Sequence, residues 1–352
     1  MSGIAMAGAV LCATIAVWAG SERSSGPHIA ASPPATPRPA AEAPPPVDFV
    51  PYVSAWAGSG YDMPAAAARG IKEFTLGFVV SGDGCTPAWD SGIPFDDEAL
   101  TARIEATRRA GGDVRISFGG ADGTELATAC EDASQLAAAY TKVIERYGII
   151  RADFDIEGEA LADADATARR AQAITMVQRT HEGLNVSFTL PAMPDGLTPT
   201  ALAQLTAARQ AGVVVSSVNV MAMNYSGDHT GDMGRYAIQA ATAAHEKVRS
   251  VLGLSDAAAW KTLAVTPMIG VNDVTGEVFT LEDAAGLARF AARKGIGRLS
   301  MWSAERDRPC APEKAGADDG AAAPESPAAT TPSASCSGVP QRPGAFEATL
   351  SG

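Results

Sequence analysis

Residues 152–158 read Ala-Asp-Phe-Asp-Ile-Glu-Gly, a short segment in which acidic and apolar side chains alternate. A period of two is typical of a β-strand, whose successive side chains point to opposite faces. Asp153, Asp155 and Glu157 therefore share one face of the predicted strand. The two apolar residues between them suit a surface that packs on helices. We expect the three carboxyl groups to stack on the opposite side, with Glu157 last along the strand.

Three carboxyl groups crowded on one face of a strand should bind protons more tightly than isolated carboxyl groups do. Ionising all three in a poorly solvated site is costly, so at least one should keep its proton near neutral pH. A carboxyl group that is protonated at working pH can act as a general acid. Two other interpretations of the same pattern remain open: an edge strand that carries solvated acids, and a calcium site.

The chain on both sides of this strand alternates short β-branched segments with longer amphipathic ones, between about residues 47 and 306. Eight strand–helix repeats in about 260 residues are typical of an α/β fold of the (β/α)8 TIM barrel class, which we predict as a single catalytic domain. A doubly wound open sheet fits the same periodicity. In a barrel, reactive residues lie at the carboxyl ends of the strands. The predicted strands are 49–54, 73–80, 113–118, 152–157, 185–190, 217–225, 262–269 and 298–302.

Composition and motifs argue against several other functions. The 352 residues include 27 Lys and Arg against 40 Asp and Glu, and a net charge of −13 disfavours nucleic acid or an anionic membrane as a partner. The four histidines and five cysteines show no H-E-x-x-H or C-x-x-C spacing, so we expect no metal. No nucleotide-binding glycine motif and no G-x-S-x-G motif occurs, and we expect no cofactor.

The N-terminal part of the chain predicts export. Residues 3–19 form an uncharged apolar run, so residues 1–20 are expected to be a signal peptide or, alternatively, a membrane anchor. Residues 21–46 are rich in Ser, Pro and Ala and are expected to form an extended linker. The catalytic domain would then span residues 47–352, with a low-complexity insert at about 313–334. We expect a secreted protein.

The cysteine positions suggest two disulfides, since export permits oxidation. Cys310 and Cys336 flank the low-complexity insert, which indicates a loop closed by a disulfide. Cys85 and Cys130 form the other predicted pair, because Cys12 would leave with the signal peptide. Four cysteines allow three connectivities, of which we favour this one.

The acidic strand resembles the D-x-x-D-x-D-x-E signature of family 18 glycoside hydrolases, the chitinases and related endo-N-acetylglucosaminidases. The resemblance covers about residues 47–350, and four further segments match in the same order. There are two departures: Ile150 stands at the first signature Asp, and Asn224 stands where the sixth strand usually carries Asp. The four segments are 115–120 (Arg-Ile-Ser-Phe-Gly-Gly, similar to S-x-G-G), 218–225 (Val-Asn-Val-Met-Ala-Met-Asn-Tyr, similar to M-x-M-D-Y), 266–270 (Thr-Pro-Met-Ile-Gly) and 301–303 (Met-Trp-Ser).

The resemblance implies a retaining hydrolase of β-1,4-linked N-acetylglucosamine polymers, chitin or chitooligosaccharides, that works through an oxazolinium intermediate. Glu157 would protonate the glycosidic oxygen, Asp155 would bind the acetamido N–H, and Asp153 would share a proton with Asp155. Tyr225 would hold the acetamido carbonyl, and Trp302 would form the floor of the subsite. No obligate protein partner is implied, and we expect a monomer.

Further residues are expected to bind substrate: Met223, Asn224 and Ser117 in the matched segments, and Trp56 and Trp89 in predicted loops. For the two tryptophans a half-buried core position is an equal alternative, and Ser117 fits a supporting role better than a chemical one. The amide of Asn224 removes a negative charge, which should lower the pKa of Glu157 and give a more acidic optimum. Two other functions remain open: a catalytically weak chitin- or glycan-binding lectin-like barrel, and an endo-N-acetylglucosaminidase acting on N-glycans.

Overall fold

The computed structural model describes residue 16, residues 47–311 and residues 332–352. The predicted signal peptide or anchor, apart from residue 16, and the predicted linker lie outside these residues, as does most of the predicted insert at 313–334. Within the part of the chain that is described, no helix combines the length and the apolar character needed to cross a membrane.

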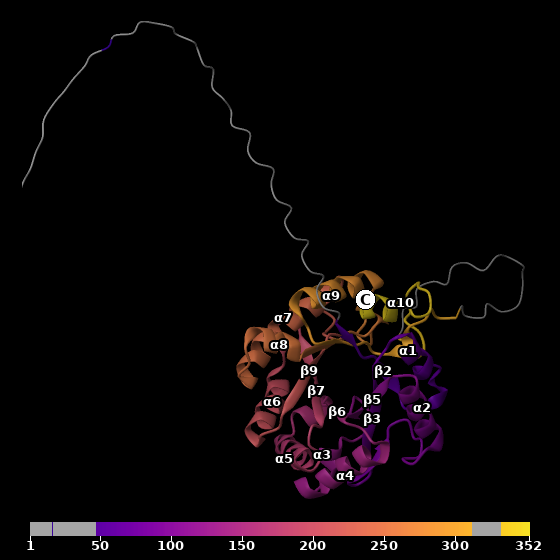
Figure 1. Ribbon diagram of the computed structural model, residues 1–352, viewed down its shortest axis with the longest axis vertical. Coiled ribbons are helices and arrows are strands. Elements are labelled where there is room, and N and C mark those ends of the chain that lie inside the picture. Colours follow the sequence, from indigo (N-terminus) through magenta and orange to yellow (C-terminus); the bar gives the residue numbers. More distant parts are fainter. Residues whose placement is uncertain (1–15, 17–46, 312–331) are drawn as a thin grey trace, which may run out of the picture. The chain divides into compact units, whose positions relative to one another are not determined.

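A parallel β-sheet curls into a closed ring at the centre of the molecule (Figure 1). The short strands β1 and β2 belong to one stretch of chain, and β1 pairs with the last strand, β13, while β2 pairs with β3. Backbone bonds from Val50 to Leu299 and from Tyr52 to Met301 continue the first of these pairings. If β1 and β2 are counted as one strand, the ring has eight strands, which confirms the predicted TIM barrel. Its strands are β1 (Asp48–Phe49) with β2 (Tyr52–Ser54), β3 (Glu73–Asp83), β5 (Asp113–Gly119), β6 (Arg151–Asp155), β7 (Asn185–Met193), β9 (Val215–Met221), β10 (Leu263–Thr266) and β13 (Arg298–Leu299).

Helices surround this ring, and their ends follow the sequence signals. The helix α9 starts with a capping box between Thr280 and Asp283 and stops at Gly295, whose φ of 72° suits glycine. Asp132 caps the start of α4, and Gly148 ends it in the left-handed region. The helices are α1 (Met63–Arg69), α2 (Glu98–Arg109), α3 (Leu126–Ala129), α4 (Ala133–Tyr147), α5 (Ala164–Thr180), α6 (Pro199–Ala211), α7 (Met233–Leu252), α8 (Asp256–Thr262), α9 (Leu281–Lys294) and α10 (Ala345–Ser351), with 3-10 turns η1 (Ala57–Ser59), η2 (Gly158–Leu161) and η3 (Ala304–Arg306).

Short antiparallel strands add to the carboxyl ends of the barrel strands. The strand β4 (Thr86–Trp89) pairs with the end of β3, and β8 (Gly196–Leu197) pairs with the end of β7. After β10, the pair β11 (Gly270–Val271) and β12 (Val278–Phe279) forms a separate hairpin. These additions build up the face on which TIM barrels carry their reactive residues.

Two disulfides join segments that follow barrel strands, one after β3 and one after β13. Cys85, in the turn between β3 and β4, is bonded to Cys130 at the end of α3. Cys310 is bonded to Cys336, and their Cα atoms are 5.0 Å apart. These are the two pairs that the sequence predicts.

The apolar side of β6 packs away from the barrel interior, as its alternation predicts. The ring of Phe154 stacks on Phe118 at 5.3 Å and contacts Phe188 on the other neighbouring strand at 5.8 Å. Tyr140 of α4 meets Phe154 edge-on at 5.0 Å. Because Phe154 is fixed against a helix, its neighbours Asp153 and Asp155 must face the barrel interior.

Candidate active site

Asp153 lies at the bottom of the site and is completely buried. Four hydroxyl groups surround its carboxylate, and they come from four different positions on three strands. Ser117 donates to Oδ2 at 2.8 Å, Thr189 contacts both oxygens at 3.0 and 2.9 Å, and Ser187 donates to Oδ1. The Tyr52 hydroxyl lies 3.1 Å from Oδ2. A carboxylate that accepts this many hydrogen bonds is held in one orientation.

A second set of polar groups holds these hydroxyls from below. Asn219 donates to Thr189 at 3.1 Å and to Tyr52 at 3.3 Å, and its own carbonyl accepts from Thr266 at 2.8 Å. The buried guanidinium of Arg115 donates to Ser187 at 3.1 Å. The interior of the barrel is therefore a connected polar network centred on Asp153.

Asp155 and Glu157 lie above this network in different surroundings. Asp155 is 4% exposed, and its Oδ1 has no hydrogen-bond partner among the described residues. Burial, followed by repulsion from Glu157 and Asp153, raises the pKa of Asp155 well above its usual range. Burial raises the pKa of Glu157 to about 7; the hydrogen bond with Asp155 opposes this rise, and the charges of Asp122 and Asp273 add to it. This pair therefore keeps a proton near neutral pH, as the crowding of acids predicts.

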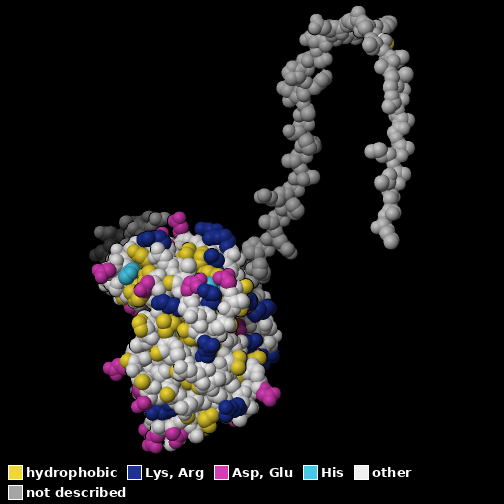
Figure 2. All heavy atoms as spheres, turned by 90° about the vertical axis from the view of Figure 1, so that its left-hand side faces the viewer, with side chains coloured by type: hydrophobic (Ala, Val, Ile, Leu, Met, Phe, Trp, Pro, Cys, Tyr) yellow, Lys and Arg dark blue, Asp and Glu magenta, His cyan; other side chains and the backbone are white. Residues whose placement is uncertain are grey.

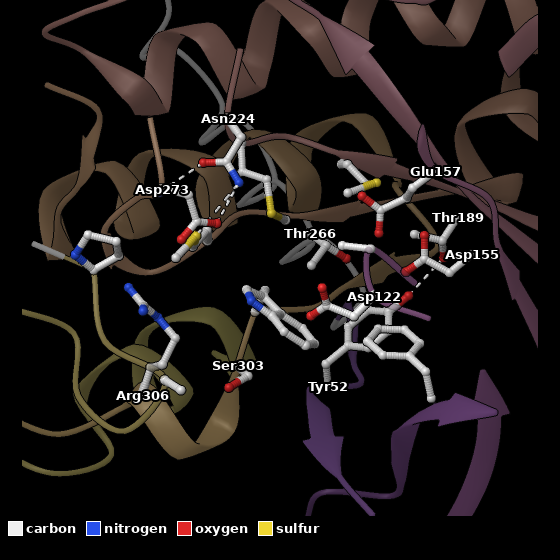
Figure 3. A pocket seen from close by; sticks show the side chains of 18 of the residues that line it. Tyr52, Asp122, Asp155, Glu157, Thr189, Asn224, Thr266, Asp273, Ser303 and Arg306 are labelled. Carbon is white, nitrogen blue, oxygen red and sulfur yellow. Dashed lines mark hydrogen bonds between the residues drawn. The ribbon is translucent and has the colours of Figure 1, made fainter. Parts of the chain in front are cut away.

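A pocket of about 330 Å³ opens above Asp155 and Glu157 (Figure 3). Trp302 lines it, and its ring contacts Tyr52 at 5.8 Å and Phe78 at 5.6 Å. Methionine side chains at 221, 223 and 268 line it as well. Aromatic and thioether groups beside two acids suit a ligand with apolar faces and polar edges.

Asn224 lines the pocket but acts on a neighbouring acid. Its φ of 51° places it in the left-handed region, which Asn tolerates better than most residues. Its amide nitrogen donates to Asp273 Oδ2 at 3.0 Å, and its carbonyl accepts from the backbone of Asp273 and Val274. Asp273 also lines the pocket and is one of the charges that raise the pKa of Glu157. The negative charge missing at position 224 is thus supplied from the loop after β11.

Tyr225 is not among the residues that line the pocket, and the role expected for it stays a prediction. The strand β9 ends at Met221, and the left-handed backbone of Asn224 breaks the alternation that would have pointed Tyr225 inward. Its ring packs against His229 and Tyr236, and its buried hydroxyl has no partner in the described part of the chain. Met223, which does line the pocket, is the inward residue at this end of the segment.

Three other predicted substrate contacts lie elsewhere. Trp89 is only 2% exposed and donates to the Tyr147 hydroxyl at 2.9 Å, because the β4 hairpin folds it against α4. Ser117 is fully buried below the pocket and supports Asp153 instead of contacting a ligand. Trp56 is 55% exposed and lies just after β2, outside the pocket but on the same side of the barrel.

Several pocket residues escaped prediction: Tyr52, Asp122, Thr189, Asp273 and Arg306. For Tyr52 and Thr189 a signal exists, since both sit at inward positions of predicted strands, as do Ser117 and Ser187. Asp122 and Asp273 lie in loops, where no periodicity indicates direction.

One group outside the pocket has the composition of a metal site. His245, Glu246 and Asp256 have ligand atoms within 4.8 Å of one another, between α7 and α8. The His245 ring stacks on Trp260 at 4.0 Å, and both acids are exposed. Arg249 already pairs with Glu246 at 2.8 Å, so this group is better explained as a helix–helix contact.

Comparisons with known proteins point to one class of enzyme. The chain is 36% identical over 277 residues to a probable bifunctional chitinase/lysozyme of Escherichia coli, and 35% identical over 277 residues to endochitinase 11 of Metarhizium anisopliae. These matches cover 74% and 75% of this chain but only 31% and 53% of the two relatives. No protein-family model matches the chain.

Solved structures extend the comparison. The catalytic domain of a hyperthermophilic chitinase from Pyrococcus furiosus has a TM-score of 0.74 and 31% identity, over 88% of this chain and 95% of that one. A GH18 chitinase from Pseudoalteromonas aurantia shares the fold with a TM-score of 0.54 and 14% identity, over 73% and 93% of the two chains.

Proposed function

The chain belongs to glycoside hydrolase family 18, and we propose that it hydrolyses the β-1,4 linkages of chitin or chitooligosaccharides with retention of configuration. The observation that carries this proposal is the contrast along β6 between a fixed carboxylate, Asp153, and a proton-holding pair, Asp155 and Glu157. A fixed carboxylate below, a carboxyl group that keeps its proton near neutral pH and an adjacent apolar pocket suit acid-catalysed cleavage of a sugar linkage.

In the first step Glu157 acts as the general acid. Its proton passes to the glycosidic oxygen, and the bond from that oxygen to the anomeric carbon breaks. The carbonyl oxygen of the sugar's own 2-acetamido group attacks the anomeric carbon and forms an oxazolinium ion. Asp155 accepts a hydrogen bond from the acetamido N–H, and its negative charge stabilises the cation.

In the second step water reopens the oxazolinium ring. Glu157, now a carboxylate, takes a proton from the water as the water oxygen bonds to the anomeric carbon. Two inversions at that carbon give a product with the β configuration. A Glu157 pKa of about 7 means that the free protein holds the required proton in weakly acidic solution.

The walls of the pocket fit an N-acetylated sugar. Trp302, backed by Tyr52 and Phe78, offers an aromatic floor for the apolar face of the ring. Met221 and Met223 provide soft apolar contacts for the acetamido methyl group. The exposed ring of Trp56 would add a stacking platform for a more distant sugar of a longer chain.

The test is hydrolysis of chitotetraose and chitopentaose by the purified protein, beside a Glu157→Gln variant. We expect cleavage by the wild type only, with β-anomeric products in NMR spectra taken before mutarotation. A thiazoline analogue of the oxazolinium ion should inhibit. Binding without cleavage would favour the lectin-like alternative, and α-anomeric products would overturn the retaining mechanism.

Substrate choice within the class needs a separate comparison. We propose chitin-type polymers over N-linked glycans because the curated relatives that match are named as chitinases. Release of the core glycan from a high-mannose glycoprotein at a rate comparable to chitotetraose cleavage would favour the endo-N-acetylglucosaminidase alternative.

We also propose that the protein is exported and acts as a monomer. Two disulfides support an oxidising location. The N-terminal sequence of protein recovered from the culture medium would test cleavage near residue 20, and light scattering would test the monomer.

A further inference from the structure

A segment far from the acidic strand in sequence returns to the pocket. Residues 332–337, here called the returning limb, follow the end of the low-complexity insert and precede α10. Pro332, Ser333 and Ala334 line the same pocket as Glu157 and Trp302. The limb therefore forms part of the surface that a ligand would meet.

Arg306 fastens the limb to the loop after β10. Its side chain, 2% exposed, donates to the carbonyls of Ile269 at 2.9 Å and Val271 at 2.5 Å, and also to the carbonyl of Ser333. Burying a guanidinium is costly unless its donors are satisfied. The two terminal nitrogens of Arg306 are satisfied by these carbonyls, while its Nε has no partner among the described residues, and the side chain connects η3, β11 and the limb.

Further contacts leave the limb little freedom. Val271 donates to the Ser337 carbonyl at 2.8 Å, and Ser337 donates to the Arg308 carbonyl at 3.0 Å. A Cβ added to Gly270 would lie 1.9 Å from the Ser337 carbonyl oxygen, so only glycine permits this approach. The Cys310–Cys336 disulfide closes the other side.

The limb and the catalytic acid occupy opposite ends of the pocket. Figure 3 shows Arg306 and Asp273 on one side of the view and Glu157 with Asp155 on the other. A sugar on Trp302 that is cleaved by Glu157 has its scissile oxygen at the Glu157 end. The next sugar at the opposite end is therefore the one on the non-reducing, or glycone, side.

We propose that the returning limb is a binding determinant for the second glycone sugar, and that Arg306 and the Cys310–Cys336 disulfide are the groups that position it. The inference rests on the proposed function. The limb offers a proline ring, a small methyl group and serine and peptide groups, which suit the apolar and hydroxyl-bearing faces of a neutral sugar. Asp273, on the same side of the pocket as Arg306, and Asn224, which is bonded to it, add polar side chains to the lining.

The experiment compares 4-methylumbelliferyl glycosides that carry one and two N-acetylglucosamine units. In the wild type kcat/KM should be much higher for the disaccharide. In Cys310→Ser/Cys336→Ser the ratio of the two kcat/KM values should fall by about fivefold or more, corresponding to the loss of about one hydrogen bond. The fall should come from KM for the disaccharide, while the monosaccharide substrate is unaffected.

The control removes the other disulfide, in Cys85→Ser/Cys130→Ser. That variant also loses a covalent constraint, but its ratio should stay at the wild-type value. Equal ratios in the two double variants would overturn the proposal. An inactive wild type would instead contradict the proposed function, so the two failures are distinguishable.

Two single substitutions guard against misfolding of the disulfide variant. Ala334→Trp adds bulk at an exposed position and should raise KM for the disaccharide only. Arg306→Lys keeps the charge but cannot reach three carbonyls, because lysine lacks the planar fork, and it should lower the ratio in the same direction. An unchanged ratio in both variants, with circular dichroism as in the wild type, would overturn the proposal.

Discussion

Asp153 and Asp155 lie two residues apart on the same face of β6, and the groups around them differ. Four hydroxyls surround the carboxylate of Asp153, and a further network fixes those hydroxyls. Asp155 has an oxygen without a partner in the described part of the chain, and its neighbour Glu157 adds repulsion. The first carboxylate is immobilised, whereas the second is left to exchange its proton.

This difference separates two tasks within one short strand. The lower part of the barrel sets position, since the hydrogen bonds to Asp153 come from the neighbouring strands β5 and β7 and from Tyr52 of β2. The upper part sets reactivity, because burial and crowding raise proton affinity at the expense of folding free energy. Substitutions on the two levels should therefore have opposite effects on the stability of the fold.

The largest effect is expected for Glu157→Gln. Loss of the general acid should lower kcat/KM on chitotetraose by a factor on the order of 10² to 10⁴. The exposed acid Glu159, two residues further along in η2, gives the matched control Glu159→Gln, which should keep wild-type activity. Equal losses in both variants would mean that Glu157 is not the acid.

The same substitution should stabilise the fold. The pKa of Glu157 is about 7 in the folded protein and about 4.3 when unfolded, so the folded state binds the proton more tightly. The ionisable group therefore costs stability as pH rises from about 4.3 through about 7. Thermal unfolding should show that the advantage of Glu157→Gln grows across this interval and levels off above it. A constant advantage would contradict the raised pKa.

On the lower level, Asp153→Asn should destabilise the protein by about 1–3 kcal/mol, because an amide cannot accept hydrogen bonds on its NH₂ side and leaves buried hydroxyls unpaired. Asp155→Asn should not destabilise it near neutral pH, since it removes a group that burial and repulsion disfavour. Urea unfolding at pH 7 compares the two changes directly. Similar losses for both would remove the distinction between the two levels.

Changes of charge at the rim of the pocket, at positions 273 and 224, should shift the pH profile of kcat/KM. Asp273→Asn removes a charge that raises the pKa of Glu157, so the alkaline limb of the kcat/KM profile should move to lower pH. Asn224→Asp adds a charge beside Asp273 and should move it to higher pH. Both shifts should be below about one pH unit, since solvent screens exposed charges.

The control for these shifts is Asp48→Asn, an identical change in charge at the exposed start of β1, at the opposite end of the barrel. Its pH profile should match the wild type. A shift as large as that of Asp273→Asn would indicate an effect of net charge alone.

The sequence correctly predicts which side chains of β6 point into the barrel, because the two-residue period of a strand is a local property. Eight strands and the inward acids follow from spacing along the chain, and the disulfide pairing that we favoured among three connectivities is the one observed. The hydroxyls that hold Asp153 sit at inward positions of predicted strands, yet their convergence depends on the register between β2, β5 and β7, which no local pattern contains.

The failures have particular causes. For Trp89 a substrate contact and a core position were equal alternatives, and the short strand β4 places it in the core beside Tyr147. Asp273 is not predicted because it reaches the pocket from a loop, where Asn224 holds it through two hydrogen bonds and holds the backbone of Val274 through a third. In each case a change of backbone direction outside the regular elements decides which way the side chain points.

The smallest effect is expected for Tyr225→Phe, which tests one such change of direction. If Asn224 ends the inward alternation, the Tyr225 hydroxyl contacts neither substrate nor Asp155, and kcat/KM on chitotetraose should stay within about twofold of the wild type. Stability should not fall, because the hydroxyl is buried without a partner in the described residues. The matched variant Tyr52→Phe removes a hydroxyl that contacts Asp153 and should reduce activity clearly. A loss above about tenfold for Tyr225→Phe would mean that this hydroxyl swings to the acetamido carbonyl when substrate binds, and that the backbone turn at Asn224 opens during catalysis.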